Sequence, residues 1–148
     1  MPTDNSEANN EAQIRELIEN RIKAVRIKDI NKVMSNYAPD VLSFDAVNPL
    51  QYLGSDAVRK RLEEWFSSFQ GPIGHEIRDL SIAAADDVAF SHGLNRVSAT
   101  KTDGGKLDMW WRATVCYRKI NGKWMITHEH ASVPFDVETG KASLDLKP

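Results

Sequence analysis

Apolar residues in the first half of the chain recur at helical spacing. From Glu11 onward they fall three or four positions apart, which predicts an amphipathic helix with one buried stripe. Asp29 can cap a second, shorter helix that Pro39 ends, and Ser55 can cap a third that Gly71-Pro72 ends. The predicted stripes are Ile14, Leu17, Ile18, Ile22 and Val25, then Ile30, Val33, Met34 and Tyr37, then Val58, Leu62, Trp65 and Phe69.

The second half of the chain changes to the two-residue alternation of β-strands, and one earlier strand is predicted at residues 41–47. Residues 73–84 switch parity midway, which a β-bulge near Asp79 would explain. Turns are predicted at Asp86-Asp87 and at Asp103-Gly104-Gly105. The chain from residue 73 onward therefore predicts four consecutive strands.

The last two strands form a hairpin around Asn121-Gly122, the dipeptide that best suits a two-residue type I′ turn. Because opposed residues share a face, this turn assigns every side chain of the hairpin to one of two faces. The predicted pairs are Ile120 with Lys123, Tyr117 with Ile126, Val115 with His128, Ala113 with His130, and Trp111 with Ser132. If the face that these pairs share is the concave face of the sheet, the two imidazoles and the phenol point toward the same space.

The opposite face of the hairpin carries Arg112 and Glu129 as diagonal neighbours, which predicts an ion pair. Trp110 lies beside them among polar residues. An aromatic side chain in such a place is typical of a subunit interface, so we expect a homodimer through this face.

The element order is helix, helix, strand, helix and then four strands, which argues for an α+β domain with an antiparallel sheet. A strongly curved sheet with the three N-terminal helices on its concave face forms a cone, whose apolar interior is a natural ligand pocket. We expect this domain at residues 11–134, with a flexible N-terminus at residues 1–10 and a C-terminal extension at residues 135–148.

Composition narrows the possible functions. The 148 residues are 41% hydrophobic and 27% charged, and the net charge of −2 gives no argument for nucleic acid or an acidic membrane as partner. The single Cys116 excludes an internal disulfide and fits a cytoplasmic location, and the polar N-terminal residues are not a signal peptide. A glycine-rich phosphate loop and a cysteine cluster are both missing, so no cofactor is expected.

Four motifs carry a resemblance to a known superfamily. They are Tyr37-Ala38-x-Asp40, Gly54, Asp86-Asp87-Val88-Ala89, and Gly122-x-Trp124-x-Ile126-x-His128-x-His130-x-Ser132. With the element order, they make the chain resemble the nuclear transport factor 2-like superfamily, and within it the SnoaL-like, ketosteroid-isomerase-like group. The closing strand is also similar to that of the association domain of calcium/calmodulin-dependent kinases. This fold hosts several enzyme classes and purely oligomerising domains, so the resemblance implies no single activity.

In ketosteroid isomerases a general-base aspartate ends the first strand, and Asp45 matches that spacing. Their oxyanion hole uses a tyrosine on the first helix and a protonated aspartic acid on the penultimate strand. The corresponding positions here lie near Arg21 or Ile22 and near Ala113 or Thr114, and none of these is a tyrosine or an acid. The resemblance therefore implies a base without the usual oxyanion donors.

Asp45 is thus the candidate base for proton removal next to a carbonyl, assisted by burial in an apolar pocket. His128 and His130 are candidates to orient or protonate the substrate; with Asp45 they could instead hold a metal, and either could be purely structural. The candidate substrate-binding residues are Tyr117, Trp111, Val115, Trp65, Phe69 and His92, of which the last three could also belong to the core.

The sequence therefore predicts a protein that binds a small apolar or ring-containing carbonyl compound, as an acid–base isomerase or lyase without cofactor or metal. Nucleic acid and membrane are not expected as partners. The alternative is a non-catalytic oligomerisation domain, and the two differ in whether Asp45 takes part in turnover.

Overall fold

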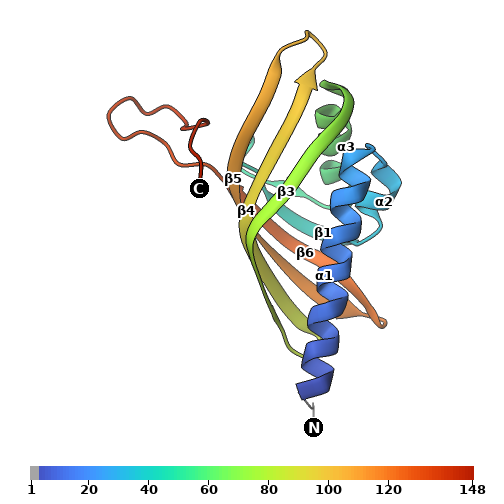
Figure 1. The fold of residues 1–148 in the computed structure, drawn as a ribbon. Coiled ribbons are helices and arrows are strands. Elements are labelled where there is room, and N and C mark those ends of the chain that lie inside the picture. The colour runs from blue at the N-terminus through green and yellow to red at the C-terminus, as the bar shows by residue number, and fades with distance from the viewer. Residues whose placement is uncertain (1–3) are drawn as a thin grey trace.

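A computed structural model describes residues 4–148 as three helices and one sheet (Figure 1). The helices are α1 (Asp4–Arg26), α2 (Ile30–Met34) and α3 (Ser55–Ser67). The strands are β1 (Tyr37–Phe44), β2 (Tyr52–Leu53), β3 (Phe69–Ala84), β4 (Val88–Lys101), β5 (Lys106–Ile120) and β6 (Lys123–Ser132). The predicted α+β class is confirmed, and no helix of the described residues is both long and apolar enough to span a membrane.

The six strands form a curved, unclosed sheet in the order β2-β1-β6-β5-β4-β3. Strands β3 to β6 make the predicted antiparallel meander. Strand β1 differs, because it runs parallel to β6. Parallel neighbours need a long connection, and here the whole chain from β2 to β5 supplies it. Helix α1 lies along the concave side of the sheet, close to β3 (Figure 1).

The core lies between α1 and the concave face of the sheet. The predicted stripe of α1 is buried, with Ile14 and Val25 at 0% and 2% exposure. It packs in one apolar cluster with residues of the sheet such as Ile73 and Ile126. This burial stabilises the cone, since each fully buried aliphatic side chain contributes about 1.5–3 kcal/mol.

Helix α1 begins at Asp4, earlier than the start predicted at Glu11. Asn10 explains part of this difference. Its side-chain amide donates to the Ala85 carbonyl at 3.0 Å and accepts from Lys119 Nζ at 2.7 Å, so the polar segment is held against the β3–β4 turn. Residues 1–3 of the N-terminus predicted to be flexible lie outside the described residues.

Three other element boundaries also differ from prediction. Asp29 caps α2 as expected, accepting from the Lys32 backbone N–H at 3.2 Å, but strand β1 already starts at Tyr37. Helix α3 follows Gly54, so Ser55 is its first residue rather than its cap. Phe69 belongs to β3, which continues through Gly71-Pro72. Strand pairing thus extends through segments that local signals mark as turns or helix ends.

The predicted bulge at Asp79 is confirmed by a register shift between Arg78 and Ser81 and by the positive φ of Asp79, 56°. It brings His75, Ile77 and Leu80 to the concave side despite their different parity.

A second bulge, in β6, was not predicted. Ile120 pairs with Lys123 and Tyr117 with Ile126 as expected, but the next pair is Cys116 with His128. Thr127 is the extra residue, and a bulge of one residue reverses the faces of everything beyond it.

The Thr127 bulge overturns part of the predicted hairpin. Val115 pairs with Glu129 and Thr114 with His130, so Glu129 lies on the concave side and His128 and His130 on the convex side. The prediction that both histidines share a face with Tyr117 and Trp111 is therefore wrong. The predicted Arg112–Glu129 ion pair is also wrong, since Arg112 Nε donates to Ser132 Oγ at 3.1 Å instead.

Candidate functional site

A cavity of about 270 Å³ lies between α1, α3 and the concave face of the sheet. Most of its lining is apolar, and aromatic side chains come from both the helix and the sheet. Lining residues include Leu62 and Trp65 of α3 and Met109, Trp111 and Val115 of β5. An enclosed, mostly apolar space with a few polar groups is the usual form of a small-molecule site.

A chain of hydrogen bonds crosses one side of this cavity. Arg21 of α1 donates to the Tyr37 hydroxyl at 2.6 Å, and that hydroxyl donates to Glu129 Oε2 at 2.8 Å. Ser43 donates to the other carboxylate oxygen, Oε1, at 3.1 Å. The Glu129 carboxylate is therefore held by two donors from β1, and Arg21 reaches it through the phenol.

The pKa shifts of Tyr37 and Arg21 indicate which atom carries the hydrogen in each of these bonds. Burial raises the pKa of Tyr37 well above its usual value, and although Arg21 opposes this, Glu129 raises it further. Burial alone would lower the pKa of Arg21, but Tyr37 and Glu129 outweigh it and the net shift is upward. The phenol therefore keeps its proton and Arg21 keeps its charge. The Nε of Arg21 is buried and has no hydrogen-bond partner among the described residues.

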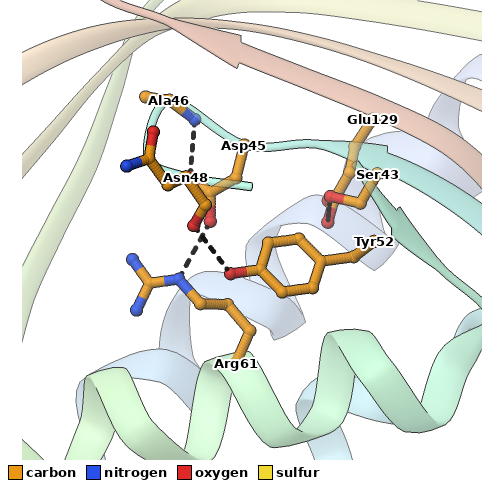
Figure 2. Close-up of polar contacts among 7 residues, drawn as sticks. All are labelled: Ser43, Asp45, Ala46, Asn48, Tyr52, Arg61 and Glu129. Carbon is orange, nitrogen blue, oxygen red and sulfur yellow. Dashed lines mark hydrogen bonds and ion pairs between the residues drawn. The ribbon is translucent and has the colours of Figure 1, made fainter. Parts of the chain in front are cut away.

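Asp45 lies elsewhere on the cavity lining, just beyond the end of β1 (Figure 2). Arg61 of α3 donates to its Oδ2 at 3.1 Å, and the Ala46 backbone N–H donates to its Oδ1 at 2.6 Å. Figure 2 shows Ser43 and Glu129 to one side of this ion pair. Both oxygens of Asp45 thus have a donor in this structure.

Two further polar pairs lie on the concave face of the sheet. His75 Nε2 is 2.9 Å from Asn95 Oδ1, and the His75 ring stacks on Trp111 with centroids 5.8 Å apart. Ser91 Oγ is 2.8 Å from the Tyr117 hydroxyl. Burial lowers the pKa of His75 to about 4 and raises the pKa of Tyr117 to about 12, so both side chains are neutral near pH 7.

Most residues predicted to bind substrate line the cavity. Tyr117, Trp111, Val115 and Trp65 do so, whereas Phe69 is buried in the core outside it. His92 is exposed, lies beside Phe90 and borders the cavity. Whether any of them contacts a substrate stays a prediction.

The two histidines predicted to be catalytic lie apart from the polar chain. His128 Nδ1 is 2.7 Å from the Leu42 carbonyl oxygen, and its ring meets Phe44 edge-on. His130 is exposed, also meets Phe44 edge-on and is one of the residues that line the cavity. Residues 4–148 contain no group of three His, Cys, Asp or Glu side chains that could hold a metal ion.

The sequence prediction missed Arg21, Glu129 and His75 as cavity residues. Arg21 had a readable signal, because it is four residues from Leu17 and three from Ile18 and so falls on the apolar stripe of α1. Glu129 had no such signal in the sequence. The face of the sheet on which it lies depends on the Thr127 bulge, which the hairpin turn does not predict.

Comparison with known proteins agrees with this architecture. The family model described as "SnoaL-like domain" matches residues 14–136. The chain belongs to the SnoaL-like domain family. No functionally curated protein matches it.

Solved structures place this SnoaL-like chain among nuclear transport factor 2-like proteins. An NTF2-like protein of unknown function from Pseudomonas putida KT2440 is 41% identical, with a TM-score of 0.87 over 95% of this chain and 98% of that one. An NTF2-like superfamily protein from Salmonella enterica serovar Typhimurium is 15% identical, with a TM-score of 0.78 over 92% and 99%. A ketosteroid isomerase-like protein from Erwinia carotovora is 19% identical, with a TM-score of 0.70 over 83% and 95%. The last two show the fold alone.

Replacing His75 by phenylalanine is expected to remove an acid-sensitive contribution to stability. The pKa of His75 is about 4 in the folded protein and near 6.5 in the unfolded chain. The unfolded chain therefore binds the proton more readily between these values. The stabilising contribution is complete above pH 6.5, falls as the pH drops toward 4, and changes no further below that.

The wild type should lose up to roughly 3 kcal/mol more unfolding free energy than His75→Phe across this pH range. Urea denaturation of both proteins, at pH values from above 6.5 to below 4, measures the difference. Other titrating groups are common to both proteins and cancel. Parallel curves of unfolding free energy against pH would contradict the assignment.

Proposed function

We propose that the cavity binds a small, mostly apolar, ring-containing molecule through a carbonyl or carboxylate oxygen placed at Arg21. The observation that carries this proposal is a guanidinium in an apolar cavity whose Nε has no partner. A buried donor without an acceptor is costly, so an oxygen from a ligand is the natural complement. By the resemblance to ketosteroid isomerases, their oxyanion donor on the first helix corresponds to a position near Arg21 or Ile22.

The surroundings of Arg21 favour binding of one small molecule rather than a long chain. The Tyr37 hydroxyl accepts from Nη2 of Arg21 at 2.6 Å, while Nε has no hydrogen-bond partner among the described residues. Apolar side chains such as Trp65 and Trp111 provide surfaces for a ring. Hydrogen bonds to a charged group contribute about 1.5–3 kcal/mol, so Arg21 should decide which apolar molecules bind.

Arg21→Met is expected to weaken binding of 2-naphthoate roughly 10- to 100-fold while leaving naphthalene unchanged, because only the carboxylate needs the guanidinium. Equilibrium dialysis of both compounds measures this. Arg26→Met is the matched control, since Arg26 is exposed on the same helix. Equal loss for both compounds, or no preference of the wild type for naphthoate, would contradict the proposal.

Acid–base catalysis on a ring-containing carbonyl compound is the more specific form of this function, and we propose Asp45 as its base. Arg61 and the Ala46 amide fix the carboxylate at the cavity lining. A carbonyl polarised by Arg21 makes the neighbouring C–H more acidic, and a positioned carboxylate can remove that proton. No catalytic role is proposed for His128 or His130, because the Thr127 bulge turns them outward.

Asp45→Asn should slow the exchange of α-protons of 2-tetralone in D2O about 100-fold or more, since the amide cannot accept the proton. Proton NMR follows the exchange. Asp56→Asn, at an exposed position in the first turn of α3, is the control and should exchange at the wild-type rate. Exchange by Asp45→Asn at the wild-type rate would rule out Asp45 as base.

The second candidate function is assembly, supported by the convex face of the sheet. Trp110 lies there half-buried, with the guanidinium groups of Arg78 and Arg96 within 5.4 and 5.8 Å of its ring. Phe90 and Val88 are 48% and 44% exposed on the same face. Aromatic and arginine side chains together are typical of interface cores, so we propose a homodimer through this surface.

Sedimentation velocity at micromolar concentration is expected to give a dimer for the wild type and a monomer for Trp110→Lys, because a new charge would be desolvated at the interface. Leu50→Lys, at a 95% exposed position, is the control and should stay dimeric. A wild-type monomer would contradict the dimer. A dimer that neither binds the naphthalene compounds nor exchanges tetralone protons would favour assembly as the function.

A further inference from the structure

His75 is a buried polar side chain of the cavity that the proposed function leaves unused. It lies on the concave face of β3 with 7% exposure, in the wall of the cavity. Its ring is held on two sides, by Asn95 at Nε2 and by stacking on Trp111. These two contacts therefore fix the orientation of the His75 ring.

The partner of Nε2 determines which nitrogen carries hydrogen. Asn95 Nδ2 donates to the Gly93 carbonyl at 3.5 Å, which directs Asn95 Oδ1 toward the ring at 2.9 Å from Nε2. A carbonyl oxygen only accepts, so Nε2 must be the donor. A neutral imidazole has one N–H, and Nδ1 is consequently a lone-pair acceptor.

Nδ1 has no hydrogen-bond partner among the described residues, although it is buried. The ring cannot turn to satisfy it without losing the Asn95 bond and the stacking on Trp111. Buried acceptors are normally paired, so Nδ1 calls for a donor that the described residues do not supply.

We propose that His75 Nδ1 accepts a hydrogen bond from a hydroxyl group of the ligand and so selects hydroxylated ring compounds. The inference rests on the proposed function, because it concerns the same cavity. Arg21 is near enough for its charge to act on His75, so a cationic donor such as an ammonium group would be repelled and a neutral hydroxyl is favoured.

The two polar groups then recognise opposite chemistry on one ligand. Arg21 offers N–H donors to a carbonyl or carboxylate oxygen, and His75 offers an acceptor to a hydroxyl. The apolar lining between them, including Val97 and Met109, excludes water and makes an unmatched polar group on either side unfavourable. The ligand class is a ring that carries a hydroxyl together with an oxygen acceptor.

The test uses three neutral probes, 2-naphthol, 2-methoxynaphthalene and naphthalene, in equilibrium dialysis with the full chain. The methoxy compound keeps the acceptor oxygen of naphthol and lacks its donor hydrogen. We expect naphthol to bind wild type about tenfold or more tightly than either of the others. His75→Phe keeps a ring against Trp111 and should equalise the three affinities without changing that of naphthalene.

Asn95→Asp is a second variant that keeps the histidine. A carboxylate beside Nε2 favours the imidazolium, so Nδ1 becomes a donor and the preference for naphthol should disappear. The nitrogen-15 chemical shifts of the imidazole report this change directly, with hydrogen on Nε2 alone in the wild type and on both nitrogens in the variant. His128→Phe, at a histidine on the convex side of β6 and outside the cavity lining, is the control and should keep the preference.

The outcomes separate this inference from the proposed function. Equal binding of naphthol and methoxynaphthalene by the wild type would overturn the role of His75, whatever Arg21 does with naphthoate. Hydrogen on Nδ1 in the wild type would overturn it as well. A wild type that prefers naphthol to methoxynaphthalene but does not prefer naphthoate to naphthalene would instead contradict the role of Arg21. That result would still support the role of His75.

Discussion

A carboxylate enclosed in an apolar cavity needs donors around it, and the arrangement of the site depends on how Glu129 obtains them. Tyr37 and Ser43 bind its two oxygens from β1, and Arg21 approaches from α1 through the Tyr37 phenol. Removing any of these partners would leave the half-buried Glu129 carboxylate with fewer donors, which is destabilising. The parallel pairing of β1 with β6, in which Ser43 lies opposite Glu129, is therefore both a structural and a chemical requirement.

Two of the β-bulges in the sheet, at Asp79 and Thr127, bring cavity residues to the concave face. The bulge at Asp79 bends β3 so that residues of both parities line the cavity, and the bulge at Thr127 turns Glu129 inward. Bulges increase local twist and end regular pairing, so they also help to keep the sheet curved and unclosed. The same two positions thus determine the shape of the cavity and the identity of its polar groups.

The concave and convex faces of the sheet carry separate kinds of chemistry. Inside are the guanidinium of Arg21, the neutral imidazole of His75 and the fixed carboxylate of Asp45, all within a mostly apolar lining. Outside, Trp110 lies against Arg78 and Arg96, and Arg96 also forms ion pairs with Glu76 and Asp108. The proposed ligand binding and the proposed assembly therefore use opposite faces of one sheet, so substitutions can test each of them separately.

Local spacing is enough to predict the elements and their class, as the stripe of α1, the Asp29 cap, the Asn121-Gly122 turn and the parity change at Asp79 illustrate. Strand alternation also places Trp111, Val115 and Tyr117 on one face. Which residues of β6 share that face depends on the folded chain. A single inserted residue reverses the alternation, and it brings Glu129 to Tyr37, 92 residues away in the sequence. Contacts of that range leave no trace in local periodicity, so Glu129, rather than His128 or His130, became visible only in the folded chain.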